Sequence, residues 1–278
     1  MMTTEAAVLH LRESPTWGGL VRDAYLGADL YEAATRFHAS GEFAEVQRLL
    51  APHLAGGTVL DLGAGTGIAS YAFARSGARL VYPLEPDPSD VVGRGAISRT
   101  CAGLPVAVLA GVGESIPLPD EHINIVYCRQ VLHHVRSLRT TIAECARVLK
   151  RGGVFLACRE HVVAGPEELR AFLDTHPIHR LAGGENAYPL KNYVNAITDC
   201  GLELLRVIRP WDSVINAFPL VHTAQELERR SPKTALSQRY GMIGRVIAWL
   251  PGMRHLLWRR MTKPKPGQLY SFLARKPD

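Results

Sequence analysis

The stretch Val59-Leu-Asp-Leu-Gly-Ala-Gly-Thr-Gly67 decides the fold of this chain. A short apolar run with the character of a buried strand leads into glycines at 63, 65 and 67, and a helical run over 68–75 follows. Alternate glycines remove side chains where a ligand must approach the backbone closely, and they permit positive φ angles. A dinucleotide-binding turn would need glycine at 68, where this chain has Ile68. The spacing therefore excludes an NAD or FAD turn and favours a different adenosine ligand.

Outward from this turn, strand-like and helix-like segments alternate along the chain. Alternation of this kind predicts a doubly wound α/β fold, in which helices cover both faces of a mostly parallel sheet. In such a sheet a ligand lies beyond the carboxyl ends of the strands. The sheet is predicted to have seven strands, over residues 58–62, 79–85, 105–109, 123–128, 153–158, 202–208 and 269–274.

The rest of the chain is organised around this core. Residues 1–53 show helical periodicity, and the core itself extends over 54–211. A helical insertion over 212–266, interrupted by Pro232 and Pro251, precedes the final strand, which lies in 267–278.

Composition excludes several classes of protein. Of 278 residues, 47% are hydrophobic and 21% are charged, a balance typical of a globular domain rather than a disordered chain. The five cysteines form no CxxC pair, which favours a reducing compartment and a cytoplasmic location. We recognise no signal peptide, and no apolar run is long enough to span a membrane. The net charge of +6 is concentrated in residues 253–265 without a recognition motif, which argues against nucleic-acid binding.

Two carboxylates occupy informative positions at strand ends. Asp61 lies at the end of the first predicted strand, where it can contact a cationic or amine-bearing group. Glu85 ends the second, where an acid can accept hydrogen bonds from both hydroxyls of a ribose. These two acids and the glycine turn are expected to meet at one edge of the sheet.

Five ordered motifs resemble the class I S-adenosylmethionine-dependent methyltransferases. They are D-L-G-A-G-T-G at 61–67, L-E-P-D at 84–87, E-S-I-P-L-P-D at 114–120, V-L-H-H-V at 131–135 and L-K-R-G-G at 149–153. The resemblance covers about residues 40–160 and is strongest toward the branch of ubiquinone/menaquinone and small-molecule methyltransferases. It implies a Rossmann-like methyltransferase fold, S-adenosyl-L-methionine as cofactor and a methyltransferase activity.

The resemblance also implies roles for individual residues. Glu85 would bind the ribose, and Pro86 would lie near the adenine. Family members usually carry an acid where this chain has Val112, so Glu114 or a backbone carbonyl is expected to take over the adenine contact. The N-terminal helices would form a lid, although the aromatic residues Trp17, Tyr25, Tyr31, Phe37 and His38 fit simple core packing as well. The complete set of predicted cofactor-binding residues is Asp61, Gly63, Ala64, Gly65, Gly67, Glu85, Pro86, Glu114, Gln130 and Val131.

Candidate catalytic residues follow the fourth and fifth predicted strands. His161 is the preferred general base, because the pKa of an ordinary histidine suits proton removal at neutral pH. Glu160 would orient His161 or pair with Arg159 at the surface. His133 is a further catalytic candidate, whereas His134 is expected to pack in the helix that follows.

Two other segments leave alternatives open. His176 and His179 could bind a metal together with Glu160 and His161, but a hydrogen-bonded loop over the pocket is favoured, and we assign no metal site. Glu185 and Asn186 could bind a hydroxyl-rich acceptor. Residues 243–260 mix tryptophan and leucine with arginine, as expected for contact with a membrane or lipid-linked substrate, for a covering subdomain or for a homodimer surface.

We therefore predict methyl transfer by in-line displacement to a small-molecule or sugar-like hydroxyl acceptor. The alternatives are C- or N-methylation of a quinone-like or amine acceptor, and a protein that binds S-adenosylmethionine without catalysis. The acceptor itself is not identified, because the segments that would bind it resemble nothing specific.

Overall fold

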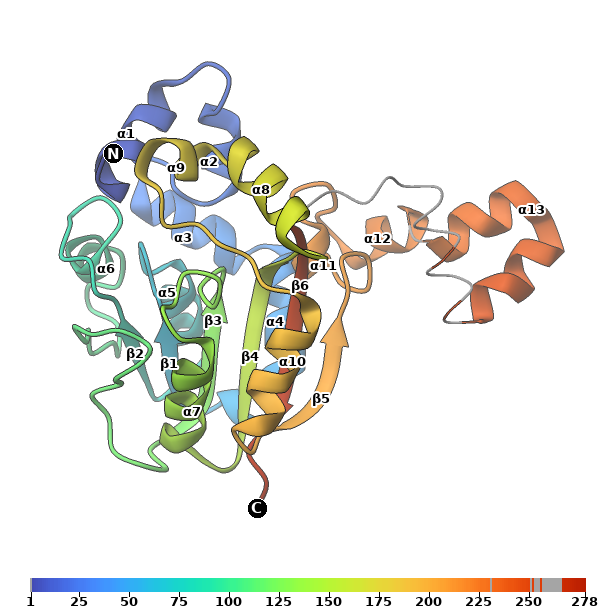
Figure 1. Ribbon diagram of the computed structural model, residues 1–278. Coiled ribbons are helices and arrows are strands. Elements are labelled where there is room, and N and C mark those ends of the chain that lie inside the picture. Colours follow the sequence, from blue (N-terminus) through green and yellow to red (C-terminus); the bar gives the residue numbers. More distant parts are fainter. Residues whose placement is uncertain (1, 231, 251, 253–255, 257–266) are drawn as a thin grey trace.

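A computed structural model describes residues 2–230, 232–250, 252, 256 and 267–278. Its centre is a six-stranded sheet with the strand order β2-β1-β3-β4-β6-β5 (Figure 1). The first four strands in that order are parallel, and β6 pairs antiparallel with both β4 and β5. The strands are β1 (Thr58–Leu62), β2 (Leu80–Leu84), β3 (Ile123–Arg129), β4 (Leu149–Val162), β5 (Glu203–Ile208) and β6 (Gln268–Arg275).

The α/β architecture predicted from the sequence is confirmed, but the described sheet lacks one expected strand. Residues 105–109 run beside β2 and form only isolated bridges, from Val106 to Val81 and from Leu109 to Leu84. The N–H groups of Val81 and Glu85, which lie on either side of Pro83, donate hydrogen bonds to carbonyl oxygens of this segment. Proline has no N–H, so it cannot donate the ladder bond between them. The ladder is broken at Pro83, and the segment does not count as a strand.

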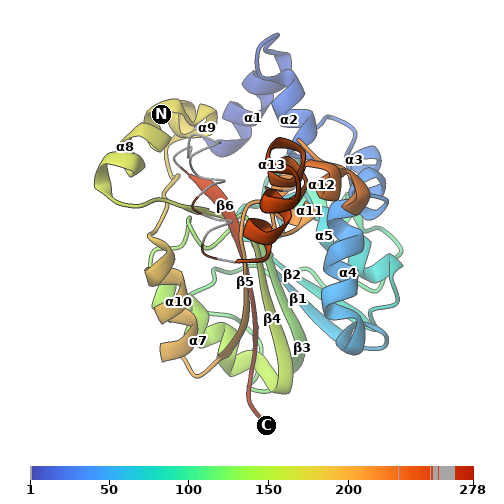
Figure 2. The same cartoon turned by 90° about the vertical axis from the view of Figure 1, so that its right-hand side faces the viewer.

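Helices cover both faces of the sheet, as Figure 2 shows edge-on. On one face, α4 (Gly41–Leu54) contacts β3 and β4, and α5 (Ile68–Arg75) contacts β1 and β2. On the other, α7 (Leu138–Val148) contacts β4, and α10 (Leu190–Asp199) contacts β5. The side chains of each strand alternate between the two cores: Ile125 and Tyr127 of β3 join the α4–α5 core, and Val126 and Cys128 join the other.

A third set of helices lies beyond the carboxyl ends of β1, β3 and β4 (Figure 1). It comprises α1 (Thr4–Glu13), α2 (Gly18–Asp23), α3 (Leu30–His38), α8 (Pro166–Thr175) and α9 (Pro177–Ala182), while α6 (Arg94–Thr100) contacts α3 and α5. Segments that are far apart in the sequence meet here. Helix α1 packs against α9, and the Met2 N–H donates a hydrogen bond to the Leu181 carbonyl oxygen. The N-terminal aromatic residues divide between roles: Tyr25 and Phe37 are buried in the core, whereas Tyr31 is exposed.

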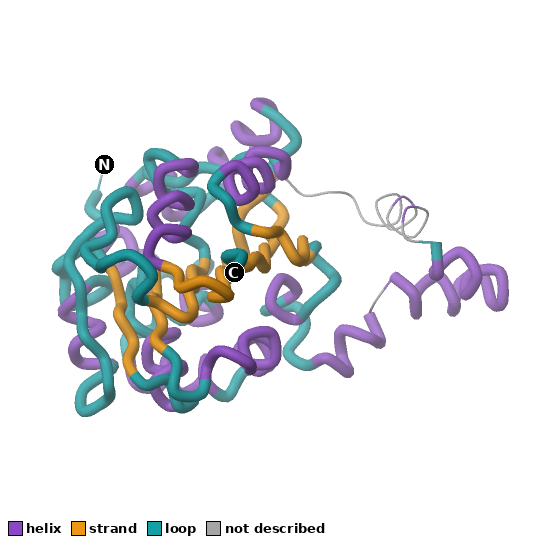
Figure 3. The backbone as a smooth tube through the Cα atoms, turned by 90° about the horizontal axis from the view of Figure 1, so that it is seen from below, coloured by secondary structure: helices purple, strands orange, loops and turns teal. Residues whose placement is uncertain are grey.

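The insertion before β6 is helical where the structure describes it, with α11 (Val214–Ala217), α12 (Ala224–Arg230) and α13 (Pro232–Trp249). Pro232 begins α13, which is kinked at Gly241; Pro251 lies outside the described residues. Helix α13 extends away from the sheet (Figure 3) and exposes Met242, Ile243, Val246 and Trp249. The suggested membrane or dimer contact over 243–260 stays a prediction, and part of that segment lies outside the described residues. Among the described helices, none combines the length and the hydropathy that crossing a bilayer requires.

Candidate active site

The turn after β1 follows the conformation that its glycines permit. Gly63, Gly65 and Gly67 all have positive φ, at 64°, 56° and 82°. A Cβ at Gly63 would lie 2.7 Å from Cγ2 of Val131, so this glycine allows the turn to pack against the segment after β3. A Cβ at Gly65 would meet no atom within 4 Å, so the backbone of Gly65 faces open space. The turn therefore has the positive φ angles expected from its glycines, and at Gly65 it leaves bare backbone facing open space.

Glu85, directly after β2, is folded back onto this turn. Its carboxylate accepts hydrogen bonds from the N–H of Gly65 at 2.9 Å and from the N–H of Asp87 at 3.0 Å. The side chain is largely buried, and burial raises its pKa above the usual range. Glu85 and the glycine turn thus form one unit, at the place where the sequence predicted a ribose site.

Asp61 lies at the same edge and is almost fully buried. Burial raises its pKa to about 7, against the opposing effect of the Ser70 hydroxyl, which donates a 2.6 Å hydrogen bond to the carboxylate. A buried carboxyl that titrates near neutrality would gain from a cationic partner, because a positive charge stabilises its ionised form.

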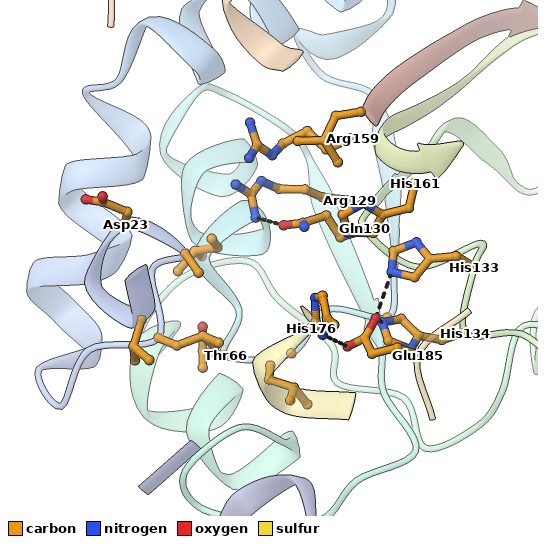
Figure 4. Close-up of a pocket in the computed structure, with 18 of the residues that line it drawn as sticks. Asp23, Thr66, Arg129, Gln130, His133, His134, Arg159, His161, His176 and Glu185 are labelled. Carbon is orange, nitrogen blue, oxygen red and sulfur yellow. Dashed lines mark hydrogen bonds and ion pairs between the residues drawn. The ribbon is translucent and has the colours of Figure 1, made fainter. Parts of the chain in front are cut away.

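A cavity of about 480 Å³ opens above this edge (Figure 4). The glycine turn and Asp61 line one side, and apolar side chains of the N-terminal helices, including Leu11 and Val21, line another. The polar side chains of the remaining wall come from the ends of β3 and β4 and from the segment around α9. They are Arg129, Gln130, His133, His134, Arg159, His161, His176 and Glu185.

Glu160 does not orient His161, nor does it pair with Arg159; both expectations were wrong. Its buried carboxylate accepts the Nδ1 hydrogen of His133 at 2.7 Å and the N–H of Val131 at 3.0 Å. The cause lies in the backbone of β4, where Ala157 pairs with Phe272 and Glu160 with Tyr270. Between these two pairs β4 advances by three residues and β6 by only two, so β4 contains a bulge. Arg159 lies within the bulge and has a φ of 61°. The extra residue turns Glu160 toward His133.

His133 and His161 lie edge to face with their ring centres 4.8 Å apart, but their charges differ. Burial disfavours the charged ring of His133, yet its contacts with Glu160 and Glu185 outweigh this effect and raise its pKa to about 9. Burial and the charge of His133 lower the pKa of His161 to about 3. His161 therefore stays neutral, with its Nδ1 hydrogen donated to the Gly267 carbonyl at 2.8 Å. Its Nε2 is then free to accept a hydrogen bond.

His134 does not pack in a helix as expected. It lies in a turn with its side chain 43% exposed, and its Nδ1 is 3.1 Å from the carbonyl oxygen of Gly184. Glu185 lies beside it, and Nδ1 of His176 is 3.6 Å from Oε1 of Glu185. Glu185 of the loop over 183–186 lines the cavity and lies close to these histidines (Figure 4). The expected loop is therefore only partly present, because residues 177–182 form α9.

Two arginines at the cavity were not anticipated, the buried Arg159 and the largely buried Arg129. Arg129 forms a two-bond ion pair with Glu42 of α4, at 2.7 and 3.2 Å, and also contacts the side-chain oxygen of Gln130. Arg159 donates to the carbonyl oxygens of Ile215 and Phe218. The available signal was an arginine placed at the end of an otherwise apolar strand, as in Cys128-Arg and Cys158-Arg.

Some predicted cofactor residues do not line the cavity. Glu114 accepts hydrogen bonds from the N–H groups of Arg136 and Ser137, at 2.7 and 3.1 Å. Its carboxylate thus holds the segment before α7. Pro86 accepts from Arg94 beyond the end of β2, and Val131 packs behind Gly63. Glu85, Gly67 and Glu160 also lie outside the cavity lining, although Glu85 is hydrogen-bonded to Gly65, which lines it. The predicted residues that do line the cavity are Asp61, Gly63, Ala64, Gly65, Gln130, His133 and His161.

Comparison with known proteins finds methyltransferases among the similar sequences and structures. Residues 60–157 match the family model described as a methyltransferase domain. Uncharacterized methyltransferase YcgJ of Bacillus subtilis (strain 168) is 31% identical over 108 residues, which cover 39% of this chain and 42% of the relative. The ubiquinone biosynthesis O-methyltransferase of Methylobacterium sp. (strain 4-46) is 33% identical over 104 residues, covering 37% of this chain and 41% of that enzyme. The chain thus spans about two fifths of these curated relatives.

Among solved structures, the S-adenosylmethionine dependent methyltransferase from Mesorhizobium loti superposes with a TM-score of 0.57. The alignment covers 86% of this chain and 99% of the other, at 15% sequence identity. At this identity the likeness establishes the fold alone.

Proposed function

Because residues 60–157 match a methyltransferase domain, we propose that this chain is a class I S-adenosylmethionine-dependent methyltransferase that methylates a small-molecule or sugar-like hydroxyl acceptor. The observation that supports this proposal most directly is the junction of Glu85 with Gly65. It joins a buried carboxylate, which does not itself line the cavity, to the backbone of Gly65, which does. A ribose carries neighbouring hydroxyls that such a carboxylate can bind.

The residues at this edge suit each part of S-adenosylmethionine. Glu85 would accept hydrogen bonds from the ribose, and the bare backbone of Gly63 and Gly65 would lie along the methionine portion. Asp61 would face its amino group, which would favour the ionised carboxylate. When bound, the cofactor supplies a methyl group that is already activated by a positively charged sulfur. The protein then has to hold the acceptor about 3–3.5 Å from that methyl group, in line with the bond that breaks.

The opposite part of the cavity supports a small acceptor with one apolar side. Leu11, Trp17 and Val21 would contact its carbon skeleton, while the histidines face its polar groups. A volume of about 480 Å³ falls within the range of ligand sites, about 300–1,000 Å³. Helices α1 and α2 contribute this apolar wall, which supports their proposed role as a lid.

His161 is the proposed acceptor of the hydroxyl proton through Nε2. It is neutral and therefore available at physiological pH, although a pKa of about 3 makes it a weak base. His133 has its Nδ1 bound by Glu160 and carries a proton, so this pair would position the acceptor rather than remove its proton.

The weakness of His161 as a base favours a second candidate function. Methylation of an amine or of an activated carbon requires little or no proton removal before transfer. The low pKa of His161 is the specific observation that supports this alternative.

Two measurements test these proposals. Calorimetry with S-adenosylmethionine and with its demethylated product should show binding in a one-to-one ratio; if neither binds, the proposed function fails. Acceptors would then be screened with labelled methyl groups.

For a hydroxyl acceptor, His161→Ala should lower the rate at saturating cofactor by about 10²–10⁴-fold. His179→Ala is the control, because His179 does not line the cavity. An unchanged rate in His161→Ala would support the second candidate.

A further inference from the structure

Three potential metal ligands converge at the cavity from two separate segments. His133 and His134 come from the turn after β3, and Glu185 comes from the loop after α9. One ligand atom from each residue lies within 4.8 Å of the other two. Nε2 of His133 and Nε2 of His134 are each 3.6 Å from the same carboxylate oxygen, Oε2 of Glu185 (Figure 4). We refer to these three residues as the His–His–Glu cluster.

Both histidines of the cluster are held in the orientation that metal-binding histidines adopt. Nδ1 of His133 lies 2.7 Å from the Glu160 carboxylate, and Nδ1 of His134 lies 3.1 Å from the Gly184 carbonyl oxygen. An oxygen acceptor at Nδ1 keeps a hydrogen on that nitrogen, so Nε2 is the atom that offers its lone pair to a metal. His133 carries a proton on both nitrogens in the metal-free protein, and a metal ion would displace the one on Nε2. Metal-binding histidines are almost always supported in this way by a carboxylate or a carbonyl.

Glu185 provides an independent observation. Its Oε2 is buried and has no hydrogen-bond partner among the described residues. Separations of 3.6 Å to the two imidazole nitrogens are too long for hydrogen bonds. They are close to the spacing of about 3.3–3.4 Å between two ligands of a tetrahedral ion with bonds of about 2.0–2.1 Å. An unpaired buried oxygen requires a physical cause, and a cation between these three atoms supplies one.

We propose that the His–His–Glu cluster binds a divalent transition-metal ion of the Zn²⁺ type. Two imidazole nitrogens and one carboxylate oxygen are a donor set suited to such an ion, and less suited to Mg²⁺ or Ca²⁺. Three protein ligands leave a coordination position free, as in catalytic zinc sites. Because all three residues line the cavity, that position is accessible to a ligand bound there.

This site differs from the combination of His176, His179, Glu160 and His161 that the sequence suggested. Glu160 lies behind His133 as its support, and His161 is bound to the Gly267 carbonyl instead. His176 contacts the other oxygen of Glu185 and so helps to fix that carboxylate, while His179 does not line the cavity. The Zn²⁺ site stands without the proposed methyl transfer. A role for the ion in binding the acceptor hydroxyl and lowering its pKa would rest on that function.

The test is Zn²⁺ binding by the full chain after treatment with a chelator, measured by calorimetry and by metal analysis. We expect one Zn²⁺ per chain. His134→Ala and Glu185→Gln should each weaken binding by at least about 10-fold, the lower end of the loss seen when even a supporting residue is removed. His134 is partly exposed and Glu185→Gln preserves shape, so both variants should fold; circular dichroism checks this. His179→Ala, from the segment next to the cluster, is the control and should bind like the parent chain.

The outcomes distinguish this site from a metal-free ion pair and from a metal site elsewhere in the chain. Absence of stoichiometric Zn²⁺ binding by the parent chain would overturn the proposal and leave a direct contact between a charged His133 and Glu185. Binding that survives both cluster variants, or that is lost in His179→Ala, would place the ion elsewhere and overturn it too. Visible absorption of the Co²⁺-loaded chain should indicate tetrahedral or five-coordinate geometry. Calorimetry with S-adenosylmethionine is run in parallel, so failure of the cofactor to bind contradicts the proposed function without affecting the metal result.

Discussion

The carboxylate of Glu85 accepts the backbone N–H of Gly65 at 2.9 Å, joining the end of β2 to the turn after β1. This contact fixes the carboxylate that we propose binds the ribose of the cofactor. Glu85→Ala should therefore weaken binding of S-adenosylmethionine by about 10- to 100-fold, since hydrogen bonds to charged groups contribute about 1.5–3 kcal/mol. Titration calorimetry measures the effect. Glu85→Gln should lose less, because an amide oxygen still accepts; equal binding by all three proteins would contradict the assigned role.

Gly63→Ala should lower the free energy of unfolding more than Gly103→Ala does. The new Cβ would lie 2.7 Å from Val131, at a φ of 64° that disfavours alanine. Left-handed backbone costs about 1–2 kcal/mol and overpacking about 1–3 kcal/mol. Gly103→Ala is the matched control, because its φ is 74° but nothing lies within 4 Å. Urea unfolding should show the larger loss for Gly63→Ala; equal losses would mean that the contact with Val131 relaxes freely.

Glu42→Ala should be strongly destabilising. Its buried carboxylate is paired with Arg129, whose side chain is 10% exposed, and loss of the carboxylate would leave the guanidinium without its negatively charged partner. Breaking one side of a buried ion pair typically costs about 3–5 kcal/mol. Glu203→Ala removes the exposed pair with Arg275 and should cost about 0–1 kcal/mol. Chemical denaturation of both variants provides the comparison, and a similar small loss at both sites would argue against burial as the deciding factor.

Asp61 should make the stability of the ligand-free protein depend on pH. Burial raises its folded pKa to about 7 from the ordinary value of 3.8, so the folded state holds its proton more tightly than the unfolded state does. This contribution is fully present below about pH 4 and is lost as the pH rises through 7. Asp61→Asn cannot ionise at this position, so its stability should not fall with pH for this reason. The midpoint of urea unfolding, followed between pH 4 and 8, should therefore fall in the parent relative to the variant.

Exposed Asp174→Asn serves as the control for that pH series. If the stability difference between the parent and Asp61→Asn stays constant with pH, the folded and unfolded states ionise Asp61 alike, and the proposed effect of burial is wrong.

Local patterns made much of the fold predictable, and also the meeting of the glycine turn with Asp61 and Glu85. Buried strands, the glycine turn, Asp61 and Glu85 all follow from neighbouring residues, because a parallel sheet places the carboxyl ends of its strands at one edge. The missing strand at 105–109 depended on one proline in the neighbouring strand. Pro83 is visible in the sequence, but its effect depends on which side of β2 is paired.

The other side of the site depends on contacts that no local pattern shows. The sequence places Glu160 next to His161 and so favours a pairing of these two residues. The bulge in β4 instead turns it toward His133, 27 positions earlier in the chain. Glu185 reaches the cluster because a loop folds back over the strand ends, and its partners His133 and His134 are about 50 positions away in the sequence.

The bulge at Arg159 has a consequence for protein engineering. In a regular strand, removing one residue turns every following side chain to the opposite face of the sheet. Without the bulge, Glu160 would therefore point to the face of the sheet opposite to the one it now shares with His133. Transplanting only the side chains of this site into a related scaffold would then leave His133 unsupported. A successful graft must also copy the irregular backbone, including the residue with positive φ, and length-matched alignments of β4 would conceal that requirement.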